Sequence, residues 1–314
     1  MESHPIIFGE VLFDCFEDGS RVLGGAPFNV AWHLQALGAA PLFISRVGDD
    51  PLGRQIRDTM QQWGLSSAAL QLDSAHPTGS VEVTIQDGEP HFEIVAERAY
   101  DFIQANALPS LEATLIYHGS LALRQPHSAS ALASLKQSHP APIFLDVNLR
   151  PPWWDAESIN QMLDDATWAK LNDDEVNALL PGSENLRNKA EHLLQCHQLE
   201  LIIVTRGSQG AFALDSQQHH AEIVPTSDTR VVDTVGAGDA FASVCILGLL
   251  RDWDLASMLS RAQVFASLIV GMRGATVRDT ALYQRLKQQW GLWYPVPPQH
   301  KRSQACTNRS PTPY

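Results

Sequence analysis

The feature that most constrains the fold of this chain is the alternation of short, continuously apolar runs with segments of helical periodicity. The runs LIYHG (115–119), PIFLDVNLR (142–150) and LIIVTRG (201–207) lack the polar alternation of a strand with one wet face. Helical patterns separate them, such as SASALASLKQ (128–137) and ENLRNKAEHLLQ (184–195). Strands that are apolar on both sides need cover on both faces. The sequence therefore predicts an α/β fold, with a mostly parallel central sheet flanked by helices on both faces.

Two segments do not fit this layer. The stretch 79–98 alternates apolar and polar residues around DGEP, which is typical of a hairpin with one exposed face. A second hairpin is predicted at 15–23, after PIIFGEVLFD (5–14), which is interpreted as one buried strand ending at Asp14. We expect both hairpins to form a small β-sheet lid. Its apolar face could cover the site or pair in a homodimer, and it comprises Val81, Val83, Ile85, Phe92 and Ile94.

Length and composition indicate one globular domain. The chain has 314 residues, of which 44% are hydrophobic and 18% charged. A single domain is predicted over 1–295, and the proline-rich, polar segment 296–314 is predicted to be a disordered tail. No apolar run reaches the roughly 18 residues of a membrane span, and no secretory signal is visible, so we expect a cytoplasmic protein without a membrane partner.

The net charge and the spacing of cysteine and histidine argue against several classes of function. The net charge of −13 argues against broad nucleic-acid binding, although a small anionic ligand needs only local positive potential. The four cysteines have no CxxC spacing and the histidines no HExxH spacing. We therefore predict neither a zinc site nor a disulfide.

Polar residues collect where the predicted strands end. In open α/β sheets, ligands bind beyond the carboxyl ends of the strands. The residues at such ends are Asp14, Asp146, Asn148, Arg150, Asn172, Thr205, Arg206 and Gly207.

The segment VDTVGAGDAF (232–241) has the composition of an anion-binding turn. Gly236, Ala237 and Gly238 allow backbone N–H groups to point toward one ligand, and the following apolar helix directs its positive end to the same place. Asp239 could accept the proton of an attacking hydroxyl there. The alternative is a tight turn in which Asp239 caps the helix. Neither a GxxxxGK[ST] nor a complete GxGxxG motif is present.

Several motifs together resemble one family. VDTVGAGDAF resembles the C-terminal signature of the ribokinase-like (PfkB) sugar kinases, and LGGAPFNVAWHLQALGA (23–39) with RVGDDPLG (46–53) resembles the N-terminal signature. NDDE (172–175) is similar to the family's NxxE element, and VTRGSQGA (204–211) to its nucleotide-side turn. The resemblance spans about residues 6–290 and implies an ATP-dependent kinase with a β-sheet lid.

The resemblance implies roles for individual residues. Asp239 would be the catalytic base, the backbone of Gly236, Ala237 and Gly238 the anion hole, and Arg150 would lie near the sugar and the moving phosphate. Sugar hydroxyls would be bound by Asp14, Gly24, Gly25 and Asn29. Asp14 could instead be a turn former, and Arg150 a surface ion pair.

On the nucleotide side, the resemblance implies that Asn172 and Glu175 order Mg²⁺ through its waters. Thr205, Arg206 and Gly207 would line the ATP, together with Gly238. Asp233 would help to hold a monovalent cation such as K⁺. Asn172 and Glu175 could instead form a capping box at a helix start.

The stretch GGAPFNVA is similar to that of fructokinases and lacks the lysine usual in ribokinases. No lysine occurs before residue 136, which disfavours a phosphorylated sugar. The resemblance therefore implies that D-fructose is converted to fructose 6-phosphate. The alternatives are kinases of ribose, 2-keto-3-deoxygluconate or a nucleoside, or a non-catalytic sugar- or nucleotide-binding protein. Phe28 is larger than the small residue usual at its position, and we expect it to reshape the sugar pocket.

Overall fold

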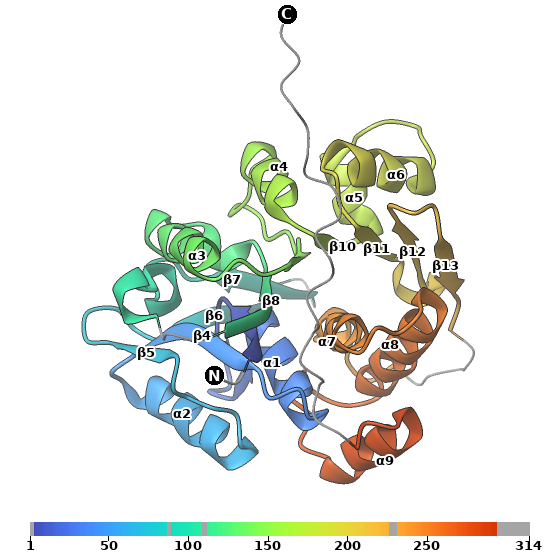
Figure 1. Cartoon of the computed structure of the whole chain (residues 1–314). Coiled ribbons are helices and arrows are strands. Elements are labelled where there is room, and N and C mark those ends of the chain that lie inside the picture. Colours follow the sequence, from blue (N-terminus) through green and yellow to red (C-terminus); the bar gives the residue numbers. More distant parts are fainter. Residues whose placement is uncertain (1–2, 87–88, 109–111, 226–230, 294–314) are drawn as a thin grey trace, which may run out of the picture.

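A large, mostly parallel sheet organises the chain, as the sequence predicted (Figure 1). The computed structural model describes residues 3–86, 89–108, 112–225 and 231–293. Within these ranges the strand order is β13-β12-β11-β10-β9-β8-β1-β4-β5. All neighbouring strands are parallel except β11–β12 and β12–β13. The strands are β1 (Ser3–Phe8), β4 (Leu42–Gly48), β5 (Leu70–Asp73), β8 (Glu112–His118), β9 (Ile143–Asp146), β10 (Trp168–Asn172), β11 (Leu201–Thr205), β12 (Ala211–Asp215) and β13 (His220–Ile223).

Helices cover both faces of this sheet. One face carries α1 (Ala26–Ala36), α2 (Pro51–Trp63), α7 (Ala237–Leu250), α8 (Leu255–Val270) and α9 (Thr280–Trp290). The other carries α3 (Pro126–Ser138), α4 (Ala156–Asp165), α5 (Asp173–Leu179) and α6 (Leu186–Cys196). Strand β1 illustrates the two-sided burial, because Ile7 packs in the core of the first face while Ile6 and Phe8 pack in that of the second. The predicted fold class is confirmed.

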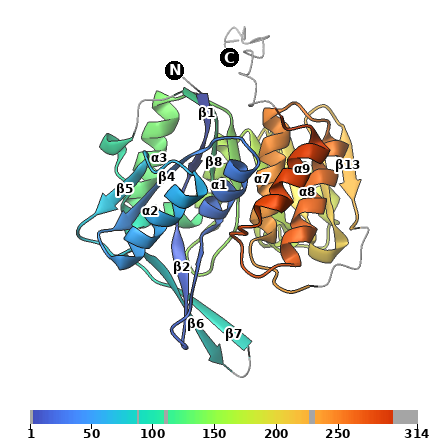
Figure 2. The same ribbon diagram turned by 90° about the horizontal axis from the view of Figure 1, so that it is seen from below.

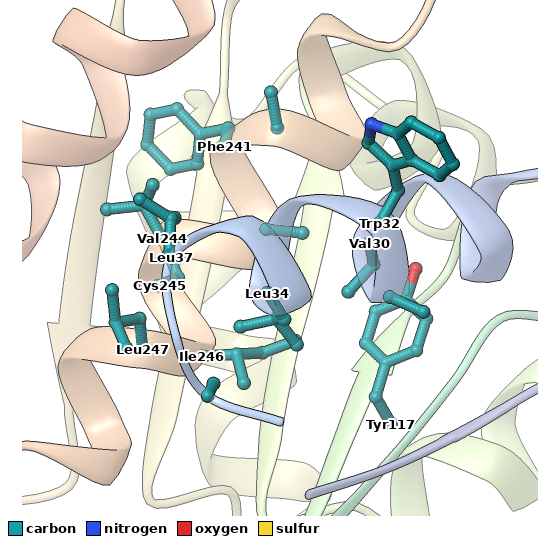
Figure 3. Close-up of a cluster of buried hydrophobic side chains, with 14 of the residues drawn as sticks. Val30, Trp32, Leu34, Leu37, Tyr117, Phe241, Val244, Cys245, Ile246 and Leu247 are labelled. Carbon is teal, nitrogen blue, oxygen red and sulfur yellow. The ribbon is translucent and has the colours of Figure 1, made fainter. Parts of the chain in front are cut away.

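The packing of α1 against α7 positions the site described below. Leu34 of α1 and Leu37, just after its end, belong to the same buried cluster as Val244 and Leu247 of α7, and Figure 3 shows these side chains meeting. All four side chains are fully buried. Burial of this kind stabilises by about 1.5–3 kcal/mol for each large aliphatic side chain. The two helix starts are therefore fixed relative to each other.

The second, smaller sheet projects from one side of the molecule (Figure 2). Its order is β3-β2-β6-β7, with β2 (Leu12–Phe16), β3 (Arg21–Gly24), β6 (Gly79–Gln86) and β7 (Glu89–Ile94). Val81 and Val83 are buried with Leu12, Tyr100 and Ala122 of the same chain. We refer to this four-stranded sheet as the lid sheet.

The predicted strand over 5–14 is wrong. Strand β1 ends at Phe8, and β2 begins at Leu12 in the lid sheet, where it pairs with β3 and β6. The break lies at Gly9, whose φ of 151° and lack of a Cβ let the chain pass against Pro27. Asp14 is consequently a lid-sheet residue in mid-strand.

Some predictions concern residues that the structure leaves out. The tail at 296–314 and the side chain of Ile85 lie outside the described residues. The homodimer and the domain limits of 1–295 stay predictions. Strands β5 and β13, each four residues long, were not predicted.

Candidate active site

Several of the predicted site residues come from strand ends and helix starts at one edge of the central sheet. Strands β9, β10 and β11 are parallel neighbours, with Lys170 opposite Asp146 and Asn172 opposite Thr205. Their carboxyl ends therefore share an edge. Asn29 and Asp239 reach each other from the first turns of α1 and α7.

Asp239 lies half-buried in the first turn of α7. Burial raises the pKa of this carboxyl to about 6, the hydrogen bond from Asn29 lowers it, Asp146 raises it, and Lys170 and Arg150 lower it. A carboxyl with a pKa near 6 is largely ionised at neutral pH and still basic enough to accept a proton. Its surroundings therefore suit a general base.

Asn29 is the direct partner of Asp239. Its Nδ2 donates a hydrogen bond of 2.7 Å to Oδ2 of Asp239. The side chain is buried, and its Oδ1 has no hydrogen-bond partner among the described residues. The sequence predicted that Asn29 contacts the sugar but not that it holds the candidate base.

Gly24 and Gly25 connect the lid sheet to α1. Gly25 has a φ of 108°, and a Cβ there would lie 2.8 Å from the carbonyl oxygen of Glu10 and 3.1 Å from Cα of Val11. Only glycine fits this close approach without strain. The backbone at Gly25 thus runs directly against the segment that joins β1 to β2.

Two acidic side chains flank this junction. Burial raises the pKa of Asp14 to about 6; Asp233 raises it further and Arg150 opposes the shift. Glu10, which the sequence did not indicate, is 2% exposed. Burial raises its pKa to about 7, and its Oε2 has no hydrogen-bond partner among the described residues.

The turn before α7 has the features expected of an anion hole. Gly236 has a φ of 80° and precedes the helix, and the N–H of Ala237 bonds to the carbonyl of Thr234 at 3.3 Å. The next N–H groups, of Gly238 and Asp239, belong to the first turn, where an α-helix provides no acceptor. Gly238 is exposed, so a ligand can approach its backbone.

Asn172 and Glu175 form the capping box that was the alternative interpretation. Oδ1 of Asn172 accepts from the N–H of Glu175, and Oε2 of Glu175 accepts from the N–H of Asn172, both at 2.8 Å. Oε1 of Glu175 also accepts from the N–H of Leu149 at 2.9 Å. This carboxylate therefore fixes the backbone beside Arg150, whose own side chain is exposed.

Other predicted residues also make local contacts. Asp233 accepts hydrogen bonds from the N–H groups of Val235 (2.9 Å) and Gly274 (3.0 Å). Arg206 forms an ion pair of 2.6 Å with Glu222. Thr205 and Gly207 flank Arg206 at the end of β11, and Gly207 has a φ of 52°.

Phe28 packs in the core beneath α1, and its effect on a sugar pocket stays a prediction. Its side chain is fully buried, with its ring centroid 5.5 Å from that of Phe43 in an edge-to-face arrangement. It also packs on Trp32. The larger side chain fills the core beneath α1.

The family model for pfkB family carbohydrate kinases matches residues 14–281. The chain belongs to this family. The prediction of a carbohydrate kinase is thereby confirmed. A fructokinase from Salmonella typhimurium is 32% identical over 308 residues, covering 91% of this chain and 98% of the relative.

Solved structures of the family share the fold. A fructokinase with bound ATP from Xylella fastidiosa has a TM-score of 0.81 and 22% identity, covering 93% of this chain and 100% of the other. A fructokinase from Vibrio cholerae bound to fructose, ADP and calcium has a TM-score of 0.75 and 24% identity, covering 90% and 99%.

Two other features are absent from the part of the chain that the structure describes. Among the described residues, no helix has the length and apolarity needed to cross a bilayer. In the same part of the chain, no group of three or more His, Cys, Asp or Glu side chains is arranged to hold a metal ion.

Proposed function

We propose that this enzyme transfers the γ-phosphoryl group of ATP to the 6-hydroxyl of D-fructose, forming fructose 6-phosphate and ADP. The observation that supports this most is the hydrogen-bonded pair of Asn29 and Asp239 at the start of α7. Similarity over nearly the whole length of a fructokinase supports the choice of sugar.

Asp239 takes the hydroxyl proton while the sugar oxygen forms a bond to the γ-phosphorus. The bond between that phosphorus and the bridging oxygen breaks, and ADP leaves. Negative charge on the moving group is stabilised by the backbone N–H groups of Gly236 and Gly238 and by the positive end of α7. The N–H of Ala237 joins them by exchanging its 3.3 Å bond to Thr234 for a phosphoryl oxygen. Arg150 adds a cation beside the same group.

The sugar lies between the lid sheet and α1. Asp14 and the unpartnered Oδ1 of Asn29 accept hydrogen bonds from its hydroxyls, and the backbone of Gly24 and Gly25 closes the pocket. The lid sheet closes over the bound sugar and excludes water, which limits ATP hydrolysis.

Mg²⁺ fits this site through its water shell. The oxygens of Glu175 already accept backbone N–H groups, yet each has a second lone pair, and Mg²⁺ characteristically retains waters in phosphate sites. Glu175, with Asn172, would hold those waters. The ion would neutralise charge on the phosphates of ATP, which is lined by Thr205, Arg206 and Gly207. Asp233 fixes the turn at which K⁺ would be held. The enzyme would act in the cytoplasm as a monomer or a lid-paired homodimer.

Coupled ADP release tests this function. The wild-type enzyme is assayed with Mg-ATP and K⁺ against fructose, glucose, ribose, 2-keto-3-deoxygluconate, adenosine and fructose phosphates, and the product is identified by ³¹P NMR. Turnover of fructose to fructose 6-phosphate, abolished in Asp239→Asn, is the expected result. Turnover of another alcohol alone overturns the substrate, and ATP and sugar binding without ADP release indicates a non-catalytic binding protein.

A further inference from the structure

A lysine that the sequence did not single out lies beneath the start of α7. Lys170 is 5% exposed, and its Nζ donates to both carboxylate oxygens of Asp146, at 2.8 Å and 3.0 Å. A Cβ built on Gly238 would lie 3.6 Å from this Nζ. The ammonium therefore sits directly behind the backbone of the anion hole.

The ammonium faces a surplus of negative groups. Burial alone would lower the pKa of Lys170, but Asp146, Glu175 and Asp239 together raise it above its ordinary value. Lys170 therefore stays charged at neutral pH. It is a fixed positive charge in a region that water does not screen, where electrostatic effects are largest.

Stability alone does not account for such a pair. A buried ion pair loses hydration on both partners, and apolar side chains of similar volume often serve the fold equally well. Asp146 and Lys170 face each other across β9 and β10, just below the edge where the site residues gather.

We infer that Lys170 is a positioning residue for phosphoryl transfer: its ammonium, oriented by Asp146, adds positive potential at the anion hole and keeps Asp239 ionised. This inference rests on the proposed kinase reaction. The residue acts through the backbone of Gly238 and through the carboxylate of Asp239. Because it is buried, it provides this charge without reorganising during the reaction.

The replacement Lys170→Met tests the inference, with plateau kcat, KM and the pH profile of kcat as readouts. We expect plateau kcat to fall about 100-fold, as when one preorganised electrostatic group is lost, with KM for fructose within threefold of wild type. The acid limb of the profile should move to higher pH. The titratable and charged groups that act on Asp239, or on which it acts, are Asp146, Lys170, Arg150, Glu10 and Tyr117.

A matched control is Lys189→Met. Lys189 is also buried, at 3% exposure, and its Nζ bonds to Asn177 and to the carbonyl of Gly182, contacts that include no proposed site residue. Its loss removes a buried ammonium from α6, outside the proposed site, and should leave kcat within twofold of wild type.

The double variant Asp146→Asn/Lys170→Met distinguishes a contribution of Lys170 to the reaction from mere neutralisation of the Asp146 charge. It removes both charges, so it tests the lysine even if the single variant does not fold. We expect kcat to stay at least tenfold below that of Asp146→Asn alone, while the acid limb returns toward its wild-type position. Recovery of kcat to the level of Asp146→Asn would mean that Lys170 only neutralises Asp146, and would overturn the inference. A folded Lys170→Met variant with wild-type kcat would also overturn it. Loss of the proposed function is recognised separately, because wild-type enzyme would then release no ADP with any sugar.

Discussion

The amide nitrogen of Asn29 lies 2.7 Å from a carboxylate oxygen of Asp239, across a separation of 210 positions in the chain. The two residues occupy the first turns of α1 and α7, which pack side by side (Figure 3). The bond lowers the pKa of Asp239 against the effect of burial. A single side chain thus links α1 to the candidate base.

Replacing Asn29 with alanine should lower kcat by about 10–100-fold, because Asp239 loses its orientation and part of its ionisation. A double-mutant cycle with Asp239→Asn measures the coupling. Since both changes disable one unit, their effects on log kcat should be far from additive. Additive losses would contradict the shared role.

The pH profile of kcat should show an acid limb near pH 6. The folded-state pKa of Asp239 is about 6, so activity is present above that pH and is lost as pH falls through it. Asp14 has a pKa in the same range. The profile is therefore also recorded for Asp14→Asn. The acid limb should persist in this variant, because Asp239 still titrates; loss of the limb would show that it reports the titration of Asp14.

Gly25→Ala should destabilise the fold by about 2–4 kcal/mol, since the new Cβ would meet the Glu10 carbonyl in a left-handed backbone conformation. Gly19→Ala is the control. Its φ is 82°, but among the described residues none beyond its two chain neighbours has an atom within 4 Å of the added Cβ, so only the conformational cost of about 1 kcal/mol remains. Urea denaturation measures both, and equal losses would show that contact with Glu10 is unimportant.

Glu10→Gln should raise Tm at pH 8 and change it little at pH 4. The folded-state pKa of Glu10 is raised from 4.5 to about 7, so its contribution to stability is present below pH 4.5 and is lost as pH rises through 7. The loss is on the order of 3 kcal/mol, at 1.36 kcal/mol per pKa unit. In thermal scans from pH 4 to 8, the Tm of the glutamine variant should therefore rise progressively above that of wild type. A Tm difference that stays constant over this range would show that ionised Glu10 does not destabilise the fold.

Glu175→Ala should lower kcat more than Asn172→Ala does. Both changes break the capping box, at a cost of about 1 kcal/mol, but only the first also releases the N–H of Leu149 beside Arg150. If both residues hold magnesium-bound water as proposed, the Mg²⁺ concentration for half-maximal rate should rise in both variants. The rise should be larger in Glu175→Ala, because Glu175 is the charged member of the pair. Titrations of Mg²⁺ at saturating ATP distinguish the two.

The fold class was predictable because a two-sided apolar strand leaves few alternatives to a helix-covered parallel sheet. The motif around Asp239 was predictable because its composition is local. The hydrogen bond from Asn29 was not, since no local pattern reports a contact between residues so far apart in the chain. Lys170 was missed for a related reason: a lone lysine within an apolar run gives no sign of the carboxylate that pairs with it on the next strand.

The error at Asp14 has a local cause. PIIFGEVLFD is apolar on both sides of Gly9 and Glu10, so its pattern predicts one strand, although this Gly-Glu pair is where the chain changes sheets. The residues nearest the break are buried on both sides, Pro5 to Phe8 in β1 and Leu12 and Phe13 in β2. At the break itself, Gly9 packs closely on Pro27 of α1.

Because of this change of sheet, Asp14 and Asp239, the two carboxylates of the proposed reaction, belong to different parts of the fold. Asp14 belongs to the lid sheet, whereas Asp239 belongs to α7 on the central sheet, and only Gly9, Glu10 and Val11 separate β1 from β2. A sugar held by both carboxylates would act as a cross-link between the two sheets. Part of its binding free energy would then be used to dock them, and would be expressed in kcat rather than in affinity. Shorter alcohols that reach only one carboxylate would therefore be slow substrates even at saturation.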